Sequence, residues 1–481
     1  MTEKISKNMK KSLIKNSEFT YTLPKSVRKG MNVNGMILAN EEMLDHIEEE
    51  AIEQLTNVAM MPGIIEPVCA MPDAHWGYGL PMGSVAAFDA KTGVISSGLC
   101  GFDINCGINL VRTNLTIEEL EPKLNELLDN LYKKIPVGVG SKNGVQLDDK
   151  MLNEVMTKGC KWCVENGFGT KKDLNHIEEN GCMENADPNK VSTLAKKRGK
   201  KQLGTLGAGN HFIEIQKASN IYDKETAKTW GITKPNQILI MIHTGSRGIG
   251  HQIASDYLKI QEESIEKYNI KLPDKQLACS PANSQEGLDY FDAMKCAVNY
   301  SFANRLIITQ KIREAFQEVF NKSWQELDIN TIYGLCHNVV KKETHNVIKE
   351  DGSREKRELY VHRKGATRAF QDQPVIIAGS MGTASWLLKG NENSMNISFG
   401  SSAHGAGRAM SRNAAIKEFN GNKIKQELKD KNIETRAPTP KSLAEEAPLA
   451  YKNVDLVIET VHGAKISTKV IELKPLGVIK G

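Results

Sequence analysis

The spacing of apolar and polar residues along the chain predicts a mixture of helices and short strands. Apolar residues recur at intervals of three and four between residues 41 and 61, and again between about 284 and 324, which predicts amphipathic helices. The second stretch is long enough for one long helix or a helical hairpin. The Thr-Ile-Glu-Glu sequence at 116–119 has the pattern of a capping box, so we expect another helix to begin there.

Short apolar runs separated by glycine-rich turns are expected to be strands. They lie at residues 85–88, 108–111, 212–215, 238–242, 359–362 and 374–377. The chain has no internal repeat and no low-complexity linker. We therefore predict an α+β fold in which residues 1–481 form a single large catalytic domain of mixed β-sheets flanked by helices, with a helical insertion near 284–330.

Composition places the chain among globular proteins of a reducing compartment. Hydrophobic residues make up 40% and charged residues 25% of the 481 positions, and the apolar runs are too short to cross a bilayer. The lysine-rich N-terminus lacks the apolar core of a secretion signal, so we expect a cytoplasmic protein. Nine scattered cysteines predict free thiols, and a net charge of +5 does not by itself indicate a polyanionic partner.

Five short segments combine glycine or asparagine with side chains that bind metals or act as nucleophiles. They are residues 101–107, 207–211, 243–248, 336–338 and 402–408. Asp103 and Cys106 lie on the first, while His211, His243 and His337 each adjoin a flexible loop after an apolar run. Functional groups often lie on loops that follow strands, so the set predicts a metal site. A buried structural cysteine or a hydrogen-bonded histidine is the commoner role of any one of them.

The number of these ligand-type side chains leaves two arrangements open. Five donors exceed the four ligands of one tetrahedral zinc, so either one site is over-supplied or two ions share a bridging ligand. Cysteine is the natural bridge. Thiolate and imidazole favour zinc, whereas the carboxylate and positions open to phosphate oxygens also suit manganese, so the residue types do not choose the metal.

The segment at 402–408 predicts a different chemistry. Small residues surround His404 and Arg408, so that backbone amides and a guanidinium can approach phosphates closely. The imidazole could then attack a nucleotide α-phosphorus and form a covalent intermediate. A metal ligand or a loop hydrogen bond is an equally open interpretation of His404.

Together these segments resemble the RtcB family of RNA ligases over nearly the whole chain. The resemblance also includes Met-Pro-Asp-Ala-His-Trp-Gly-Tyr-Gly at 71–79, His-Arg-Lys-Gly-Ala-Thr-Arg at 362–368, Gly-Ser-Met-Gly at 379–382 and Lys480. It implies an enzyme that depends on manganese and GTP. Such an enzyme joins RNA 2′,3′-cyclic phosphate or 3′-phosphate ends to 5′-hydroxyl ends, through a histidine-GMP intermediate and an RNA-ppG activated end, in tRNA splicing and RNA repair.

The resemblance also implies a role for individual residues. Cys106 would bridge two manganese ions, with Asp103 and His211 on one and His243 and His337 on the other. His404 would be the guanylated nucleophile, oriented by Asp73. The residues implied to hold the nucleotide are Asn210, Ser380 and Arg408 for the phosphates or ribose, and Phe212, Glu214, Ser385, Tyr451 and Lys480 for the guanine.

The family resemblance further implies RNA partners such as tRNA exon halves or broken RNA, a possible Archease-type activator and a monomeric enzyme. Two positions depart from the family pattern. Trp76 stands where a polar residue is expected, and Ala403 where cysteine is common. Neither departure removes a catalytic group.

Three alternative interpretations are less well supported. Lys349-Glu-Asp-Gly fits the Lys-x-Asp-Gly pattern of lysine-nucleotidylate ligases, but Asp-Gly between two strand-like runs is an ordinary hairpin turn. Cys160 and Cys163 suggest a structural zinc module, yet they have no second Cys-x-x-Cys partner. Residues 196–201 and the Arg363-Lys364 pair could neutralise phosphates, although for 196–201 we favour a solvated surface.

Overall fold

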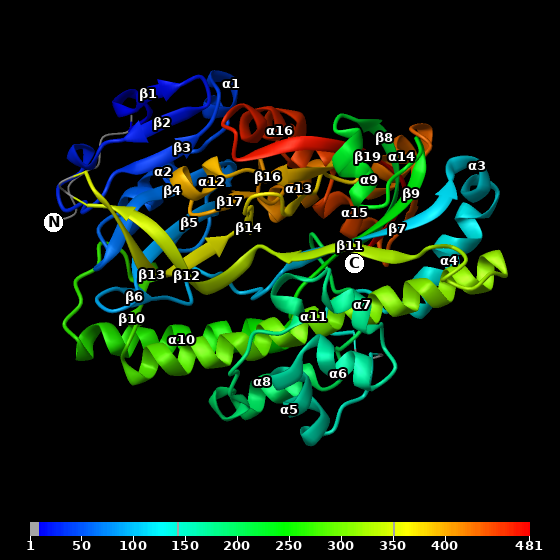
Figure 1. Ribbon diagram of the computed structural model, residues 1–481, viewed down its shortest axis with the longest axis horizontal. Coiled ribbons are helices and arrows are strands. Elements are labelled where there is room, and N and C mark those ends of the chain that lie inside the picture. The colour runs from blue at the N-terminus through cyan, green and yellow to red at the C-terminus, as the bar shows by residue number, and fades with distance from the viewer. Residues whose placement is uncertain (1–8, 142–143, 350–351) are drawn as a thin grey trace.

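A computed structural model describes residues 9–141, 144–349 and 352–481 of the chain. Two large sheets follow one another along its longest axis (Figure 1). The first has seven strands in the order β1-β2-β3-β4-β5-β13-β12. Their bounds are β1 (Ile14–Ser17), β2 (Thr20–Leu23), β3 (Gly35–Leu38), β4 (Ile64–His75), β5 (Met82–Asp89), β12 (Asn338–Ile348) and β13 (Arg354–Lys364).

The second sheet has eight strands and follows the order β11-β7-β9-β8-β19-β16-β15, with β18 beside β19. Its strands are β7 (Gly107–Thr116), β8 (Phe212–Ile221), β9 (Gln237–Thr244), β11 (Asn330–Cys336), β15 (Pro374–Ile377), β16 (Ser385–Gly390), β18 (Glu434–Arg436) and β19 (Ser467–Lys480). Two short pairs complete the strands of the described residues: β6 (Val94–Ile95) with β10 (Ser280–Pro281), and β14 (Ala366–Arg368) with β17 (Ser401–Ala403).

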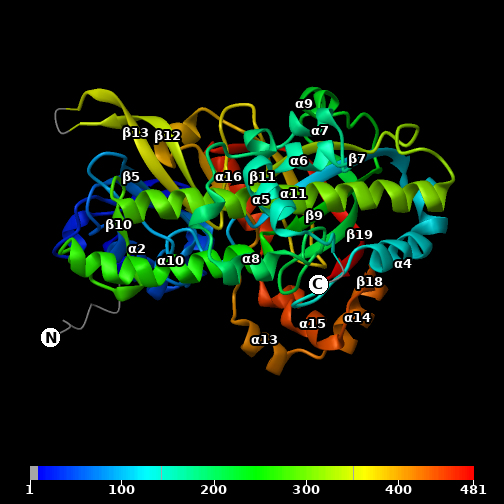
Figure 2. The same ribbon diagram turned by 90° about the horizontal axis from the view of Figure 1, so that it is seen from below.

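Helices surround both sheets. The short ones are α1 (Glu41–Asp45), α2 (Glu49–Val58), α3 (Ile117–Leu120), α4 (Leu124–Lys134), α5 (Asp149–Lys158), α6 (Cys160–Glu165), α7 (Lys171–Leu174), α8 (Thr193–Gly199), α9 (Lys224–Thr229), α12 (Asn393–Ile397), α13 (Arg412–Glu418), α14 (Gly421–Asp430), α15 (Pro440–Glu445) and α16 (Val454–Gly463). The long helices α10 (Arg247–Lys267) and α11 (Gln285–Phe320) lie side by side beneath the sheets, as Figure 2 shows from below.

The 36-residue helix α11 is the central element of the fold. It begins at Ser284, whose hydroxyl accepts the Gly287 N–H at 3.2 Å, and it ends before Asn321, which has a left-handed backbone. The helix contacts α10, α5, α4 and strands β7 and β9. Because it is covered from several sides, its middle turns are buried all round and include polar residues such as Asn304 and Arg305.

The predicted α+β class is confirmed. Each of the predicted strands lies within an observed one, the capping box at Thr116 begins α3, and residues 284–324 contain a single helix and not a hairpin. That all 481 residues form one domain stays a prediction, and residues 1–8 of the N-terminal segment lie outside the described part. Among the described helices, none combines the length and the apolar character needed to cross a membrane.

One predicted helix differs from the observed structure. Residues 41–61 form two helices, α1 and α2, separated at Glu48, which has an extended backbone. The Glu48 carboxylate accepts the backbone N–H of Trp76, a contact between distant parts of the chain. The break in the helix thus coincides with a tertiary contact, which the local spacing of apolar residues cannot indicate.

Candidate metal and nucleotide site

The candidate metal ligands lie at one edge of the second sheet because of its strand order and register. Strands β11, β7, β9 and β8 are consecutive neighbours. Gly107 at the start of β7 pairs with Cys336 at the end of β11 and with Thr244 at the end of β9, while Phe212 at the start of β8 pairs with His243. Antiparallel pairing therefore places Cys106, His211, His243 and His337 at the same edge.

The side chains at this edge form two overlapping groups that share Cys106: Asp103, Cys106 and His211, and Cys106, His243 and His337. The Cys106 Sγ lies 3.4 Å from His211 Nε2 and 3.2 Å from His243 Nε2. His243 Nε2 and His337 Nε2 are 3.3 Å apart, and His211 Nε2 is 2.8 Å from Asp103 Oδ2. Two donors on one tetrahedral ion are separated by about 3.4 Å, so this arrangement fits bound cations.

Burial sets the protonation of this cluster. It lowers the pKa of His243 and of His337 well below the usual value, and the neighbouring imidazoles lower both further. Burial also raises the pKa of the Cys106 thiol, as does the Asp103 carboxylate. His243 and His337 are therefore neutral, which is the form that binds metals, and a cation is needed to favour the thiolate.

Helix α11 supports the segments that run from Asn105 to Cys106 and from His243 to Gly245. The Arg305 Nη1 donates to Asn105 O and to Thr244 O, each at 2.9 Å, and its Nη2 donates to Asn105 Oδ1 at 2.9 Å. The Asn304 amide donates to Gly245 O at 3.2 Å. A side chain on Gly245 would also collide with Asp103, since a Cβ there would lie 2.2 Å from Asp103 Oδ1.

His404 lies beside the metal cluster, immediately after β17. Its ring centroid is 4.7 Å from that of His337. The His404 Nδ1 lies 2.6 Å from Asp73 Oδ2, and the same oxygen accepts the backbone N–H groups of His404 and Gly405 at 3.2 Å. Gly407 allows this approach, because a Cβ there would lie 2.4 Å from Asp73 O. A proton on Nδ1 would face Asp73 and would leave the lone pair on Nε2.

A cavity opens next to His404 and His243, and most of the residues predicted to hold a nucleotide line it. These are Asn210, Phe212, Glu214, Ser380, Arg408, Tyr451 and Lys480. Ser385 lies one layer behind the wall, where its hydroxyl accepts the N–H of Gly379, a lining residue, at 3.1 Å. Cations and hydrogen-bonding groups thus surround a concave space of the kind that binds small anionic ligands.

Glu446 is a cavity residue that the sequence did not indicate. Its side chain is 2% exposed, lies 3.2 Å from the Arg408 guanidinium and 3.6 Å from the Lys480 ammonium, and accepts the Tyr451 hydroxyl. Burial raises its pKa, but the cations of Lys480, Arg412 and Arg408 lower it overall. Its neighbours in the sequence carry no motif. Only the meeting of Arg408, Tyr451 and the C-terminal Lys480 gives this acid a role.

Comparison with known proteins agrees with this geometry. Residues 54–481 match the family model described as tRNA-splicing ligase RtcB. The chain is 49% identical to a tRNA-splicing ligase RtcB of Methanococcus maripaludis, with 98% of this chain and 100% of that protein covered. It is 48% identical to that of Thermococcus kodakarensis, with 94% and 96% covered. The chain belongs to the RtcB family. The metal cluster, His404 and the cavity lie within the matched residues.

A basic groove adjoins the metal cluster of this RtcB chain. It encloses about 890 Å³ and reaches Asp103 and His211, with Asn210 shared between the groove and the nucleotide cavity. Its cationic lining residues are Lys197, Arg198, Lys201, Arg247 and Arg412. Lys197, Arg198 and Lys201 are exposed, as we interpreted 196–201, and they also line this groove; Lys197 and Arg198 lie on α8 and Lys201 just after it.

The structure corrects one interpretation and locates two alternatives. Arg363 and Lys364 are buried, with Arg363 paired to Glu343 at 2.7 Å and Lys364 bonded to Gly98 O at 3.1 Å, so neither is placed to neutralise phosphates. Lys349 lies in the turn between β12 and β13, where its carbonyl accepts the Gly352 N–H at 2.9 Å. Glu350 and Asp351 lie outside the described residues.

The Cys-x-x-Cys sequence does not form a metal site in the described part of the chain. Cys160 and Cys163 are buried on α6 and belong to neither of the ligand groups found there. Burial raises the pKa of both thiols. They pack as apolar side chains, which is the usual role of buried free cysteine.

Proposed function

We propose that this RtcB family member is a GTP- and manganese-dependent RNA ligase that joins 2′,3′-cyclic phosphate or 3′-phosphate RNA ends to 5′-hydroxyl ends. The observation that carries the proposal is the position of His404. It has Asp73 at one ring nitrogen, the Cys106 and histidine cluster beside it, and a cavity with Arg408 and Lys480 in front of it. A nucleophile, its orienting acid and phosphate-binding cations thus converge on one space.

Two manganese ions would be held by the shared thiolate. Cys106 would bridge them, with Asp103 and His211 completing one site and His243 and His337 the other. When bound, such ions neutralise phosphate charge and orient phosphate oxygens for in-line displacement. Manganese is proposed over zinc from the family resemblance.

The first chemical step assigned to this chain is guanylation of His404. The Nε2 lone pair attacks the α-phosphorus of GTP, the bond to the β-phosphate oxygen breaks, and pyrophosphate leaves. Asp73 holds the Nδ1 proton and stabilises the positive charge that develops on the ring. Arg408 and Asn210 line the same cavity and would bind the phosphates, while Glu214, Phe212 and Tyr451 would bind the guanine.

The next two steps transfer the GMP group and seal the RNA. Hydrolysis first opens any cyclic phosphate. An oxygen of the RNA 3′-phosphate attacks the guanylate phosphorus, the P–N bond breaks, and His404 recovers its lone pair. The 5′-hydroxyl oxygen then attacks the activated 3′-phosphorus, loses its proton, and displaces GMP. Activation is needed because an unmodified phosphate monoester has no suitable leaving group.

RNA would reach this site through the basic groove. Lys197, Arg198 and Lys201 line it, and it leads to Asp103 and His211 at the metal cluster. Phosphate contacts of this kind hold a nucleic acid in register without reading its sequence. Roles in tRNA splicing and RNA repair, an Archease-type activator, a monomeric state and a cytoplasmic location are parts of this proposal that rest on the family resemblance.

The decisive test asks which residue becomes covalently labelled when the protein reacts with α-labelled GTP. The protein is incubated with manganese and α-labelled GTP, and the acid-labile adduct is quantified and mapped. We expect the adduct on His404, its complete loss in His404→Ala, and its retention in Lys349→Ala, which removes the lysine of the alternative mechanism. A normal adduct in His404→Ala, or a label mapped to Lys349, would overturn the assignment. Joining of RNAs with 2′,3′-cyclic phosphate and 5′-hydroxyl ends then tests the whole reaction.

A further inference from the structure

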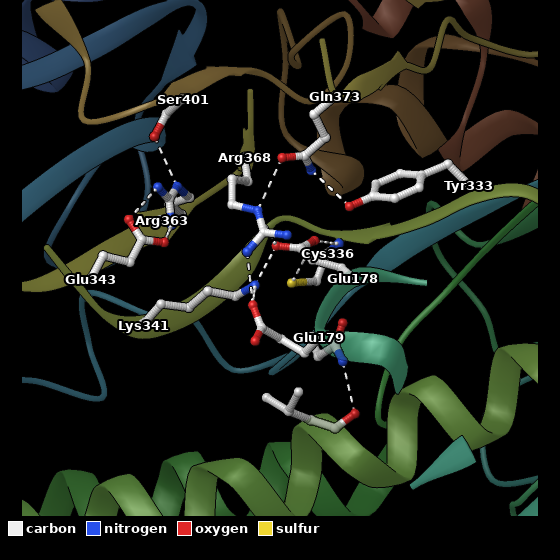
Figure 3. Close-up of polar contacts among 12 residues, drawn as sticks. Glu178, Glu179, Tyr333, Cys336, Lys341, Glu343, Arg363, Arg368, Gln373 and Ser401 are labelled. Atoms are coloured by element: carbon white, nitrogen blue, oxygen red, sulfur yellow. Dashed lines mark hydrogen bonds and ion pairs between the residues drawn. The ribbon is translucent and has the colours of Figure 1, made fainter. Parts of the chain in front are cut away.

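A cluster of four charges, two of them buried and two partly exposed, lies beside the end of β11, next to His337 in the sequence. We call Glu178, Glu179, Lys341 and Arg368 the Glu178 cluster (Figure 3). Lys341 donates to Glu178 Oε1 and, at 2.8 Å, to Glu179 Oε1, while Arg368 Nη1 donates to Glu179 Oε1 at 2.8 Å. Glu178 is 1% and Lys341 4% exposed. Two acidic and two basic side chains balance in charge, which makes the burial of Glu178 and Lys341 tolerable.

The Glu178 carboxylate accepts a backbone hydrogen bond from β11 at the position where parallel strand pairing stops. Ile177 pairs in parallel with Gly334 of β11, and Gly334 N donates to His176 O at 2.8 Å. A continuing strand would offer the Glu178 carbonyl to the N–H of Cys336. The Glu178 side chain accepts that N–H instead, at 3.0 Å, and lies 3.4 Å from the Cys336 thiol.

The backbone next to Glu178 is in an unusual conformation. Glu179 and Asn180 have φ values of 56° and 51°, the left-handed region that non-glycine residues seldom adopt. This turn carries the main chain away from β11 but keeps both carboxylates beside Lys341. Strained backbone persists where the surrounding contacts over-determine it, and it is often found beside functional sites.

The residue after Cys336 is the candidate ligand His337. Its own N–H donates to Cys106 O at 2.9 Å, and its carbonyl accepts the Ala366 N–H at 3.2 Å. Two consecutive backbone N–H groups at the end of β11 are therefore fixed. The Cys336 N–H is held by the Glu178 carboxylate, and the His337 N–H, which points the opposite way, is held by the Cys106 carbonyl. Because His337 Nε2 is 3.3 Å from His243 Nε2, a small shift of this backbone would move a ligand out of place.

The other end of the cluster contacts the segment that carries His404. Arg368 ends β14 and pairs with Ser401 of β17, and His404 follows β17 directly. Arg363 supports the same strand through Ser401 Oγ at 2.8 Å (Figure 3). The Glu178 cluster is thus joined to Cys336, which precedes His337, and through the Arg368 backbone to β17, which precedes His404.

We propose that Glu178 is a positioning residue, whose carboxylate fixes the Cys336–His337 backbone and so keeps the His337 imidazole in line with His243 and His404. The inference rests on the proposed metal-dependent guanylation. A glutamine at this position would turn one acceptor oxygen into a donor, and this NH₂ would face either the Lys341 ammonium or the Cys336 N–H. The end of β11 would then lose its anchor.

The test compares Glu178→Gln with a control that removes an equally buried acid. Asp173 is 3% exposed, forms an ion pair with Arg313 at 2.7 Å, and also accepts the Thr331 hydroxyl of β11 at 2.9 Å, five residues before Cys336. For full-length wild type, Glu178→Gln and Asp173→Asn, we measure manganese affinity by equilibrium dialysis, the rate of GMP-adduct formation at saturating manganese, and thermal unfolding.

We expect Glu178→Gln to weaken manganese binding at least tenfold and to slow adduct formation at least tenfold, whereas Asp173→Asn lowers the unfolding temperature but leaves manganese affinity within twofold of wild type. Equal manganese affinity in Glu178→Gln and wild type would overturn the inference. The inference would also be overturned if Glu178→Gln and Asp173→Asn lost the same manganese affinity and the same thermal stability. Wild type that neither binds manganese nor forms the adduct would instead overturn the proposed function.

A second variant covers the case in which Glu178→Gln does not fold. Glu178→Asp keeps the charge that balances Lys341 and Arg368, but its side chain is one methylene shorter and cannot hold both Lys341 and the Cys336 N–H. We expect it to fold and to bind manganese more weakly than Asp173→Asn does. Wild-type affinity in Glu178→Asp would overturn the positioning role.

Discussion

At the scale of single residues, Glu214 gives the nucleotide cavity a pH dependence. Burial raises the pKa of this carboxyl group to about 8, despite the opposing effects of Gln216 and Lys480. Near pH 7 the free protein therefore holds Glu214 mainly protonated. The ionised carboxylate can accept guanine N–H groups through both of its oxygens, whereas the neutral acid carries a proton on one of them, so GTP binding should release a proton below pH 8. We expect GTP affinity at saturating manganese to rise about fifty-fold between pH 6 and pH 8.

Isothermal titration calorimetry in buffers of different ionisation enthalpy measures this proton release directly. Glu214→Gln is the matched control, because it has nearly the same shape and cannot titrate. It should bind GTP more weakly at pH 8 and show little change in affinity between pH 6 and pH 8. A wild-type affinity that does not change with pH, or one that falls, would contradict the assignment of Glu214 to the guanine.

At the scale of elements, helix α11 serves the site through buried polar side chains. Arg305 donates hydrogen bonds both to Asn105 O, next to Cys106, and to Thr244 O, next to His243. Lysine has a single nitrogen and cannot reproduce the planar fork of arginine. We expect Arg305→Lys to weaken manganese binding about tenfold or more, as measured by equilibrium dialysis, because the two ligand loops lose their common support.

Arg313→Lys is the control for a general effect on stability. Arg313 lies on the same helix, is as fully buried as Arg305, and donates to Asp173 and to Ile329 O. Both variants should lower the unfolding temperature, since each leaves buried acceptors unsatisfied. Equal manganese affinities in the two variants would show that Arg305 supports the fold but not the metal ligands.

The elements were predictable wherever local pattern decides them. Apolar runs between glycine turns identified the strands, and spacing at three and four identified α11, because sheets and helices bury side chains with fixed periods. Residues 41–61 were predicted as helical but divide at Glu48, whose partner Trp76 is remote in sequence. Arg305 was overlooked among the apolar residues at helical spacing, although a charge inside a buried helix is itself a signal of a functional contact.

At the scale of the whole molecule, two openings meet at the metal cluster. The nucleotide cavity lies on the His404 side and the basic groove on the Asp103 side, and Asn210 and Arg412 line both. We expect Lys197→Ala combined with Lys201→Ala to weaken RNA binding and to reduce the slope of log affinity against log salt by about 1.4, which is the value for two phosphate contacts on a single strand.

The double variant should still form the GMP adduct at the wild-type rate, because neither lysine lines the nucleotide cavity. Lys228 and Lys322 lie outside the groove lining and provide a charge-matched control pair, which should leave the salt dependence unchanged. RNA affinity is measured by filter binding over a range of salt concentrations. An unchanged slope in the Lys197 and Lys201 variant would place the RNA elsewhere on the molecule.

The sequence by itself determined which residues are able to carry the chemistry, because ligand type, nucleophilicity and backbone freedom belong to single residues and short motifs. Asp103, Cys106, His404 and the histidines could therefore be named as candidates before any coordinates. Tertiary structure alone decided that His211, His243 and His337 share one edge, through the pairing of β11, β7, β9 and β8. It alone also revealed the contacts from which we infer roles for Glu446, Arg305 and Glu178, because the partners of these buried charges are far away along the chain.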